Sequence, residues 1–152
     1  MITVRGGSRT QRKHTKSIAE FCIAKLLPRH QNLDIDINIK SFGKDNNYGY
    51  CLPVDDSAHP KEFEIEVNKS MRLRRLLETV AHELVHVKQF ARGELYESTR
   101  QGKHRWQGEW LDEDPDYWDR PWEIEAHGRE VGLFVRWAEK EDLAHKRWTQ
   151  DS

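Results

Sequence analysis

Hydrophobic and polar residues follow two different periods in the first half of the chain. Apolar residues recur every three or four positions from Thr15 to Leu27, which predicts a helix that Pro28 ends. Alternation of apolar and polar residues, bounded by turn residues, then predicts strands. The predicted strands are 33–40, 48–53 and 62–68. The residues that precede the first helix, 1–12, are expected to form a loose lead-in.

The second half of the chain begins with a long predicted helix, 70–92, which carries an apolar stripe and is followed by Gly93. An aromatic stretch bracketed by glycines, 102–111, is expected to form a hairpin. The last helix is predicted over 121–140, with Asp119 as a candidate cap. This order of elements predicts an α+β domain. In it, a three-stranded sheet, antiparallel or mixed, packs on the long helix.

Composition indicates a small, very polar and folded domain. The 152 residues have a charged fraction of 34%, a net charge of -1 and 6 Trp. Disordered chains are poor in aromatic residues and carry a large net charge, so these values favour a single folded domain over 1–152. The balanced charge gives no overall bias toward nucleic acid, although residues 5–16 are locally basic.

The sequence lacks the patterns that would indicate a membrane span, a signal peptide or a disulfide framework. No apolar run approaches the roughly 18 residues of a membrane span, and the N-terminus lacks the apolar core of a signal peptide. Cys22 and Cys51 are too few for a disulfide framework. We therefore expect a reduced, cytoplasmic chain without a membrane partner.

The residues His82-Glu83-Leu84-Val85-His86 form an HExxH motif in the middle of the long helix. Positions i and i+4 share a helix face, so His82 and His86 can both reach one ion at a Zn–N distance of about 2.0–2.1 Å. Glu83 lies about 100° around the helix from His82 and can face a metal-bound water, where a general base is needed. The motif therefore predicts a zinc hydrolase.

A catalytic zinc site needs a third protein ligand. The candidates downstream are His104, Asp112, Glu113, Asp116, Glu123, Glu125 and His127. Glu123 and His127 are i, i+4 neighbours on one face of the last helix. Glu125 points some 200° away from Glu123, so these two glutamates cannot serve the same ion.

The motif followed by Glu123-x-x-Ala126 on a second helix resembles the gluzincin pattern. That resemblance implies that Glu123 is the third ligand and that His127 supports a ligand histidine. Gluzincins have Asp or Asn at that place, so His127 stays open as a ligand itself. Residues 78–89 also resemble the SprT-like metalloprotease domain, whose third ligand is a histidine in a later loop; His104 would then take this role.

Both resemblances imply a zinc metallopeptidase that acts on a protein or peptide. Zinc would polarise the scissile carbonyl, and Glu83 would take the proton of the attacking water. The candidates for stabilising the oxyanion are Tyr117, His104 and His127. In zincins the strand before the active-site helix pairs with substrate, so 62–68 is expected to line the cleft. Its glutamates would favour basic substrates or prevent aggregation.

Two other functions remain open at this point. One is a non-catalytic module that binds metal in the same fold. The other is a SprT-like protease acting on DNA-associated proteins, which the basic N-terminal residues and the tryptophans would support. All six tryptophans lie in the last third of the chain: Trp106, Trp110, Trp118, Trp122, Trp137 and Trp148. We expect Trp137 to lie in the core. Trp106, Trp110, Trp118 and Trp122 flank the proposed third ligand, and we expect them to pack around it rather than to stack on nucleic-acid bases.

Overall fold

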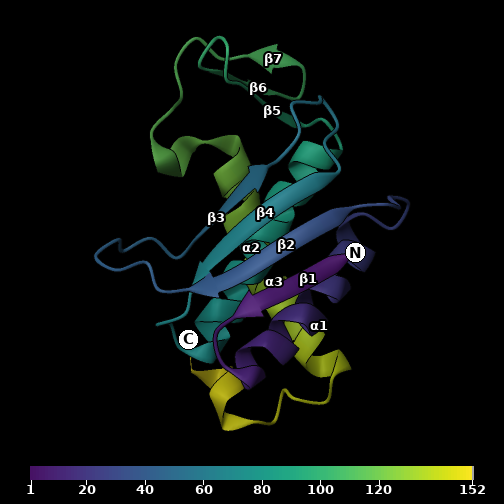
Figure 1. Cartoon of the computed structure of the whole chain (residues 1–152), viewed down its shortest axis with the longest axis vertical. Helices are drawn as coiled ribbons and strands as arrows, with labels where there is room; N and C mark the ends of the chain where they lie inside the picture. The colour runs from purple at the N-terminus through teal and green to yellow at the C-terminus, as the bar shows by residue number, and fades with distance from the viewer. Residues whose placement is uncertain (152) are drawn as a thin grey trace.

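The computed structural model describes residues 1–151. Within these residues, three α-helices lie on one face of a four-stranded sheet, and a three-stranded sheet lies at one end of the molecule, at the top of Figure 1. The elements are β1 (Ile2–Gly6), α1 (Arg9–Leu26), β2 (Asp34–Lys40), β3 (Gly49–Pro53), β4 (Glu62–Asn68), α2 (Leu73–Ala91), β5 (Leu95–Ser98), β6 (Lys103–Trp106), β7 (Glu109–Trp110), the 3-10 helix η1 (Tyr117–Asp119), α3 (Pro121–Lys140) and the 3-10 helix η2 (Arg147–Gln150). The predicted α+β class is confirmed.

The main sheet has the strand order β1-β2-β4-β3. β1 and β4 both run parallel to β2, whereas β3 runs antiparallel to β4, so the sheet is mixed. It has four strands where three were expected. β4 lies between β2 and β3, so the expectation that 62–68 pairs with a substrate is wrong: both of its edges are already hydrogen-bonded. The free edge on that side belongs to β3.

The expected loose lead-in is instead β1 and the first turn of α1. Ser8 caps the helix: its Oγ accepts from the Gln11 N–H at 3.1 Å, and its own N–H donates to Gln11 Oε1 at 2.8 Å. Gly6 has a φ of 77°, and a Cβ there would lie 2.1 Å from the carbonyl oxygen of Ile39. Glycine is therefore required where the chain leaves β1 beside β2.

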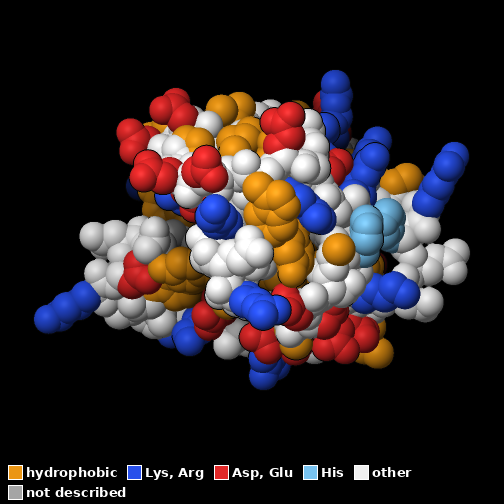
Figure 2. Space-filling model, turned by 90° about the horizontal axis from the view of Figure 1, so that it is seen from above, with side chains coloured by type: hydrophobic (Ala, Val, Ile, Leu, Met, Phe, Trp, Pro, Cys, Tyr) orange, Lys and Arg blue, Asp and Glu red, His pale blue; other side chains and the backbone are white. Residues whose placement is uncertain are grey.

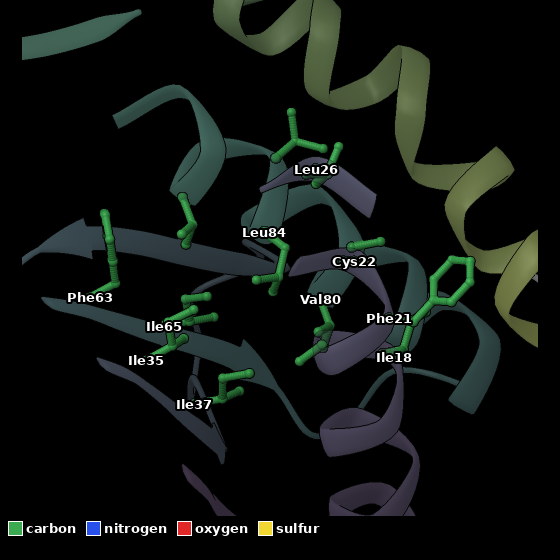
Figure 3. Packing of buried hydrophobic residues seen from close by; sticks show 14 of the residues in the cluster. Ile18, Phe21, Cys22, Leu26, Ile35, Ile37, Phe63, Ile65, Val80 and Leu84 are labelled. Atoms are coloured by element: carbon green, nitrogen blue, oxygen red, sulfur yellow. The ribbon is translucent and has the colours of Figure 1, made fainter. Parts of the chain in front are cut away.

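The core lies between the main sheet and the helices α1 and α2 (Figure 3). Ile35, Ile37 and Ile65 point from the sheet toward Leu84 of α2 and Ile18 of α1, and each of the five is at most 2% exposed. Burying side chains of this size contributes roughly 1.5–3 kcal/mol each. The alternate, mostly acidic residues of β2 and β4 face away from this core, as the alternation predicts.

The second sheet is formed by β5, β6 and β7, all antiparallel. The hairpin expected at 102–111 is present as β6 and β7, and its turn passes through Gln107 and Gly108, which have positive φ values of 49° and 86°. β5 was not expected. Seen from this end in Figure 2, hydrophobic side chains form a band between groups of acidic and basic side chains.

Helix α3 begins at Pro121, which suits the first helical position because its missing N–H has no partner to lose there. The expectation that Asp119 caps this helix is wrong. The capping residue is Arg120, and its side chain makes no cap hydrogen bond. Among the described residues, no helix is both long and apolar enough to cross a membrane.

Candidate metal centre

Two imidazoles on α2 face one carboxylate on α3. The Nε2 atom of His82 lies 3.0 Å from Glu123 Oε1, and the Nε2 atom of His86 lies 3.2 Å from Glu123 Oε2. One ligand atom from each of the three residues lies within 4.8 Å of the others. Ligand atoms around a tetrahedral zinc ion are separated by about 3.4 Å, as bonds of about 2.1 Å require. The three residues expected as ligands are thus brought together at a spacing that could hold a metal ion.

The local sequence explains this placement. HExxH puts both histidines on the side of α2 that faces α3, while Leu84 and Val85 are buried. Glu123 lies in the first turn of α3, where a negative charge is favoured by the helix dipole. Ala126, which is 0% exposed, lets the two helices approach closely.

The charges of these groups are strongly coupled. Burial alone would lower the pKa of His82, yet its hydrogen bonds to Glu123 and Glu130 outweigh burial and raise the pKa to about 10. Burial would likewise raise the pKa of Glu123, but the hydrogen bonds from His82 and His86 hold that pKa well below its usual range. The chain alone therefore keeps a carboxylate beside imidazolium, and a cation that binds here must displace protons.

Each histidine also has a partner on its other ring nitrogen. His82 Nδ1 lies 3.3 Å from Glu130 Oε1, and His86 Nδ1 lies 2.7 Å from Gln89 Oε1. Such partners orient metal-binding imidazoles and fix which nitrogen is free. Sequence reasoning missed both. The sequence held one hint of these partners: Gln89 follows His86 by three positions and Glu130 follows Glu123 by seven, so each pair shares a helix face.

His127 lies beside the site but not in its expected role. Its Nδ1 lies 2.6 Å from Glu130 Oε1, and its ring centroid lies 4.4 Å from that of His82. The support expected from His127 is therefore provided to His82 by Glu130. His82, His127 and Glu130 also form a second group whose ligand atoms lie within 4.8 Å of one another. His127 therefore stays a candidate ligand.

The other alternative ligands lie outside both groups. Glu125 is bonded instead to Lys88 Nζ at 2.6 Å and to Gln89 Nε2 at 2.9 Å. His104, on β6, is bonded to Asp114 at 2.8 Å and stacks on Trp122. Asp112, Glu113 and Asp116 likewise contribute to neither group. Among the described residues, the geometry thus favours Glu123.

Glu83 and Tyr117 lie beside the three candidate ligands. Glu83 is 5% exposed, and burial raises the pKa of its carboxyl despite the nearby charges of His86 and His82. The hydroxyl of Tyr117 lies 3.0 Å from Glu123 Oε1 and 2.9 Å from His127 Nε2. Burial and the charge of Glu123 raise the pKa of Tyr117, so its hydroxyl keeps its proton and can donate it in a hydrogen bond.

Four of the six tryptophans pack together in two pairs. Trp122 is 4% exposed and packs on Trp106 and His104, at the start of the helix that carries Glu123. Trp137 and Trp148 pack with each other at the other end of α3. Trp122 and Trp106 thus fill the packing role that was expected of them, whereas Trp110 and Trp118 remain 44% and 71% exposed. Trp118 lies beside His127.

No protein-family model, no curated protein and no solved structure matches the chain.

Proposed function

We propose that this chain is a zinc-dependent metallopeptidase with a small zincin-like fold. Zinc is held by His82, His86 and Glu123, and Glu83 is the general base. The observation that supports this proposal is the convergence of two imidazole Nε2 atoms and one carboxylate between α2 and α3. The site fits zinc because two nitrogens and one carboxylate oxygen are ligands that zinc accepts, with a fourth position left for water.

When bound, zinc supplies a Lewis acid that polarises a carbonyl oxygen and lowers the pKa of water. The chain's own residues supply the proton transfers. Glu83, whose pKa burial raises, accepts a proton from the attacking water on a carboxylate oxygen and passes it to the leaving amine. Tyr117 donates a hydrogen bond to the oxyanion, since its hydroxyl lies beside Glu123.

The free edge of β3 gives an extended peptide a place to bind. The Asn68 N–H donates to the Tyr48 carbonyl, and the Val54 N–H donates to the Glu62 carbonyl. In an antiparallel ladder, alternate residues bond to the partner strand, so the backbone groups of Cys51 face away from β4. A substrate strand can pair there, and Gly49 at the start of β3 lies against Glu83.

The experiment combines metal analysis with peptidase assays on denatured proteins and peptide libraries. We expect about one zinc per chain, which the His82→Ala, His86→Ala double variant loses. Glu83→Gln should keep zinc and lose activity. Glu64→Gln, on the exposed face of β4, is the matched control and should keep both. Full zinc occupancy in the double variant would contradict the site. Bound zinc without any cleavage would favour the non-catalytic module.

A second candidate function, action on nucleic-acid-bound proteins, has one structural observation in its favour. Residues 1–33 carry seven Lys or Arg and a single acid, Glu20. Several of them line a groove of about 970 Å³ between β1, α1 and the end of α3, together with Lys140. A row of cations of this kind suits a phosphate backbone.

Fluorescence anisotropy with labelled single-stranded DNA tests this candidate. Replacing Arg9, Lys13 and Lys16 by Gln should weaken binding and flatten its salt dependence, because each lost phosphate contact reduces the salt slope by about 0.7–0.9. Lys44, Lys61 and Lys69, replaced together by Gln, provide the control, since none of them lines the groove. Equal binding by both triple variants would remove this candidate.

A further inference from the structure

The side chain of Gln89 is fully buried between α2 and α3, at 0% exposure. Its Oε1 lies 2.7 Å from His86 Nδ1. Its Nε2 donates to the carbonyl oxygen of Trp122 at 2.9 Å and to Glu125 Oε1 at 2.9 Å. One amide therefore connects a candidate ligand on α2 with the first turn of α3, which carries another.

These contacts allow only one orientation of the amide. The Trp122 carbonyl and the Glu125 carboxylate are acceptors, so the NH₂ group of Gln89 must face them. The reversed amide would place its oxygen against two acceptors in a buried site. The oxygen of Gln89 therefore faces His86.

The orientation of Gln89 in turn determines the proton position on His86. An amide oxygen can only accept, so His86 Nδ1 must carry the hydrogen of this bond. A neutral imidazole has a single N–H, which leaves a lone pair on Nε2. That atom is the one that faces Glu123.

Glu125 is itself held firmly as a carboxylate. Its Oε2 lies 2.6 Å from Lys88 Nζ and 3.0 Å from Arg129 Nε. Lys88 is 7% exposed and is also paired with Glu94 at 2.9 Å. A carboxylate between two cations stays an acceptor, and it keeps the Gln89 amide from turning.

We propose that Gln89 and Glu125 are positioning residues that act in series: Glu125 orients the Gln89 amide, and Gln89 fixes the Nδ1–H form of His86, so that Nε2 is free to bind a metal ion. This inference rests on the proposed zinc site. It assigns Glu125, which sequence reasoning had placed among the possible ligands, a role through Gln89 rather than on the metal.

The first test is the zinc affinity of Gln89→Leu, which replaces the amide by an apolar side chain of similar size and so removes the acceptor for His86. Losing such a partner lowers metal affinity by about 10–100-fold. In the nitrogen-15 NMR spectrum of the zinc-loaded protein, the wild type should show His86 protonated at Nδ1. In Gln89→Leu this proton should exchange with water much faster, a change that loss of packing elsewhere would not produce.

The second test asks whether Glu125 acts through Gln89. Glu125→Gln should weaken zinc binding in the wild-type background and change it no further in Gln89→Leu, because the two residues form one chain of contacts. Glu139→Gln, exposed on the same helix and paired with Arg136, is the control and should leave the affinity unchanged. Circular dichroism establishes that each variant is folded.

The outcomes separate this inference from the proposed function. A wild-type chain that binds no zinc would overturn both. Zinc binding that is equally tight in the wild type and in folded Gln89→Leu would overturn the inference alone. Additive losses from Glu125→Gln and Gln89→Leu would show that Glu125 acts by another route and would overturn the serial arrangement.

Discussion

Gly49 on β3 packs directly against the carboxylate of Glu83 on α2: a Cβ at position 49 would lie 3.2 Å from Glu83 Oε2 and 2.9 Å from Thr79 Cγ2. The absence of a side chain at position 49 therefore leaves the space in which the Glu83 carboxylate lies.

Under the proposed function, Gly49→Ala should displace Glu83 and lower peptidase activity while zinc stays bound, because the atoms nearest to a Cβ at position 49 belong to Thr79, Glu66 and Glu83 and not to a proposed zinc ligand. The crowding should also cost about 1–3 kcal/mol of unfolding free energy. Urea unfolding, zinc content and activity measure the three effects. Gly128→Ala is the control, since a Cβ there meets nothing within 4 Å and a helical alanine is favoured by about 1 kcal/mol. Unchanged activity in Gly49→Ala would contradict the assignment of Glu83 as base.

Tyr117→Phe should lower kcat by about 10²–10³-fold and leave zinc content unchanged, because it removes the proposed hydrogen-bond donor to the oxyanion and none of the proposed ligands. Steady-state kinetics and metal analysis measure the two quantities. Tyr96→Phe, on β5, should behave as the wild type. If kcat were retained in Tyr117→Phe, another group would have to stabilise the oxyanion.

Trp137→Ala should lower the unfolding free energy by about 3–5 kcal/mol through loss of buried contacts. Trp137 is 0% exposed, and its Nε1–H donates to Ser17 Oγ at 2.9 Å, which joins α3 to α1. Trp110→Ala, at a 44% exposed position, should cost less than about 1 kcal/mol. Urea unfolding followed by circular dichroism compares them. A loss below about 1 kcal/mol in Trp137→Ala would mean that the buried contacts of Trp137 contribute little.

The thiol of Cys22 should make stability fall at high pH. Burial raises its pKa, so the folded chain keeps the proton while the unfolded chain releases it above about pH 8.5. Its contribution is complete below that pH and decreases above it by up to about 1.4 kcal/mol per pH unit. The difference in unfolding free energy between wild type and Cys22→Ala should therefore shrink from pH 9 to pH 10.5. A constant difference would show that the folded chain also ionises this thiol.

Local sequence patterns were sufficient to predict the central elements of the fold. Strict alternation over 33–40 and 62–68 predicted β2 and β4, and the apolar stripe of 70–92 predicted α2, because each of these segments buries one face. β1 contains only two alternating apolar residues, Ile2 and Val4, which is too short a pattern to predict a strand. Its formation depends on pairing with β2, which is distant in sequence. β5 is four residues long and likewise depends on β6.

In the candidate site, too, features set by local sequence could be predicted, whereas features set by contacts between distant segments could not. The HExxH spacing alone places His82 and His86 on one face. Glu123 was expected from the resemblance to the gluzincin pattern, which left His104, Glu125 and His127 as alternatives. Only the packing of α3 on α2 brings Glu123 beside His82 and His86. The spacing of Gln89 after His86 and of Glu130 after Glu123 was a hint, but it became an assignment only with the structure, which shows which imidazole nitrogen each residue contacts.

The fluorescence of the exposed Trp118 should report on zinc binding at the candidate site. Its ring centroid lies 4.9 Å from that of His127, and through Glu130 this histidine is connected to His82. The emission of an indole depends on the charges near its ring, and zinc bound at His82 would change those charges. Zinc titrated into the metal-free chain should therefore alter the tryptophan emission, and Trp118→Phe should abolish most of that change, so occupancy can be followed without labels or a substrate.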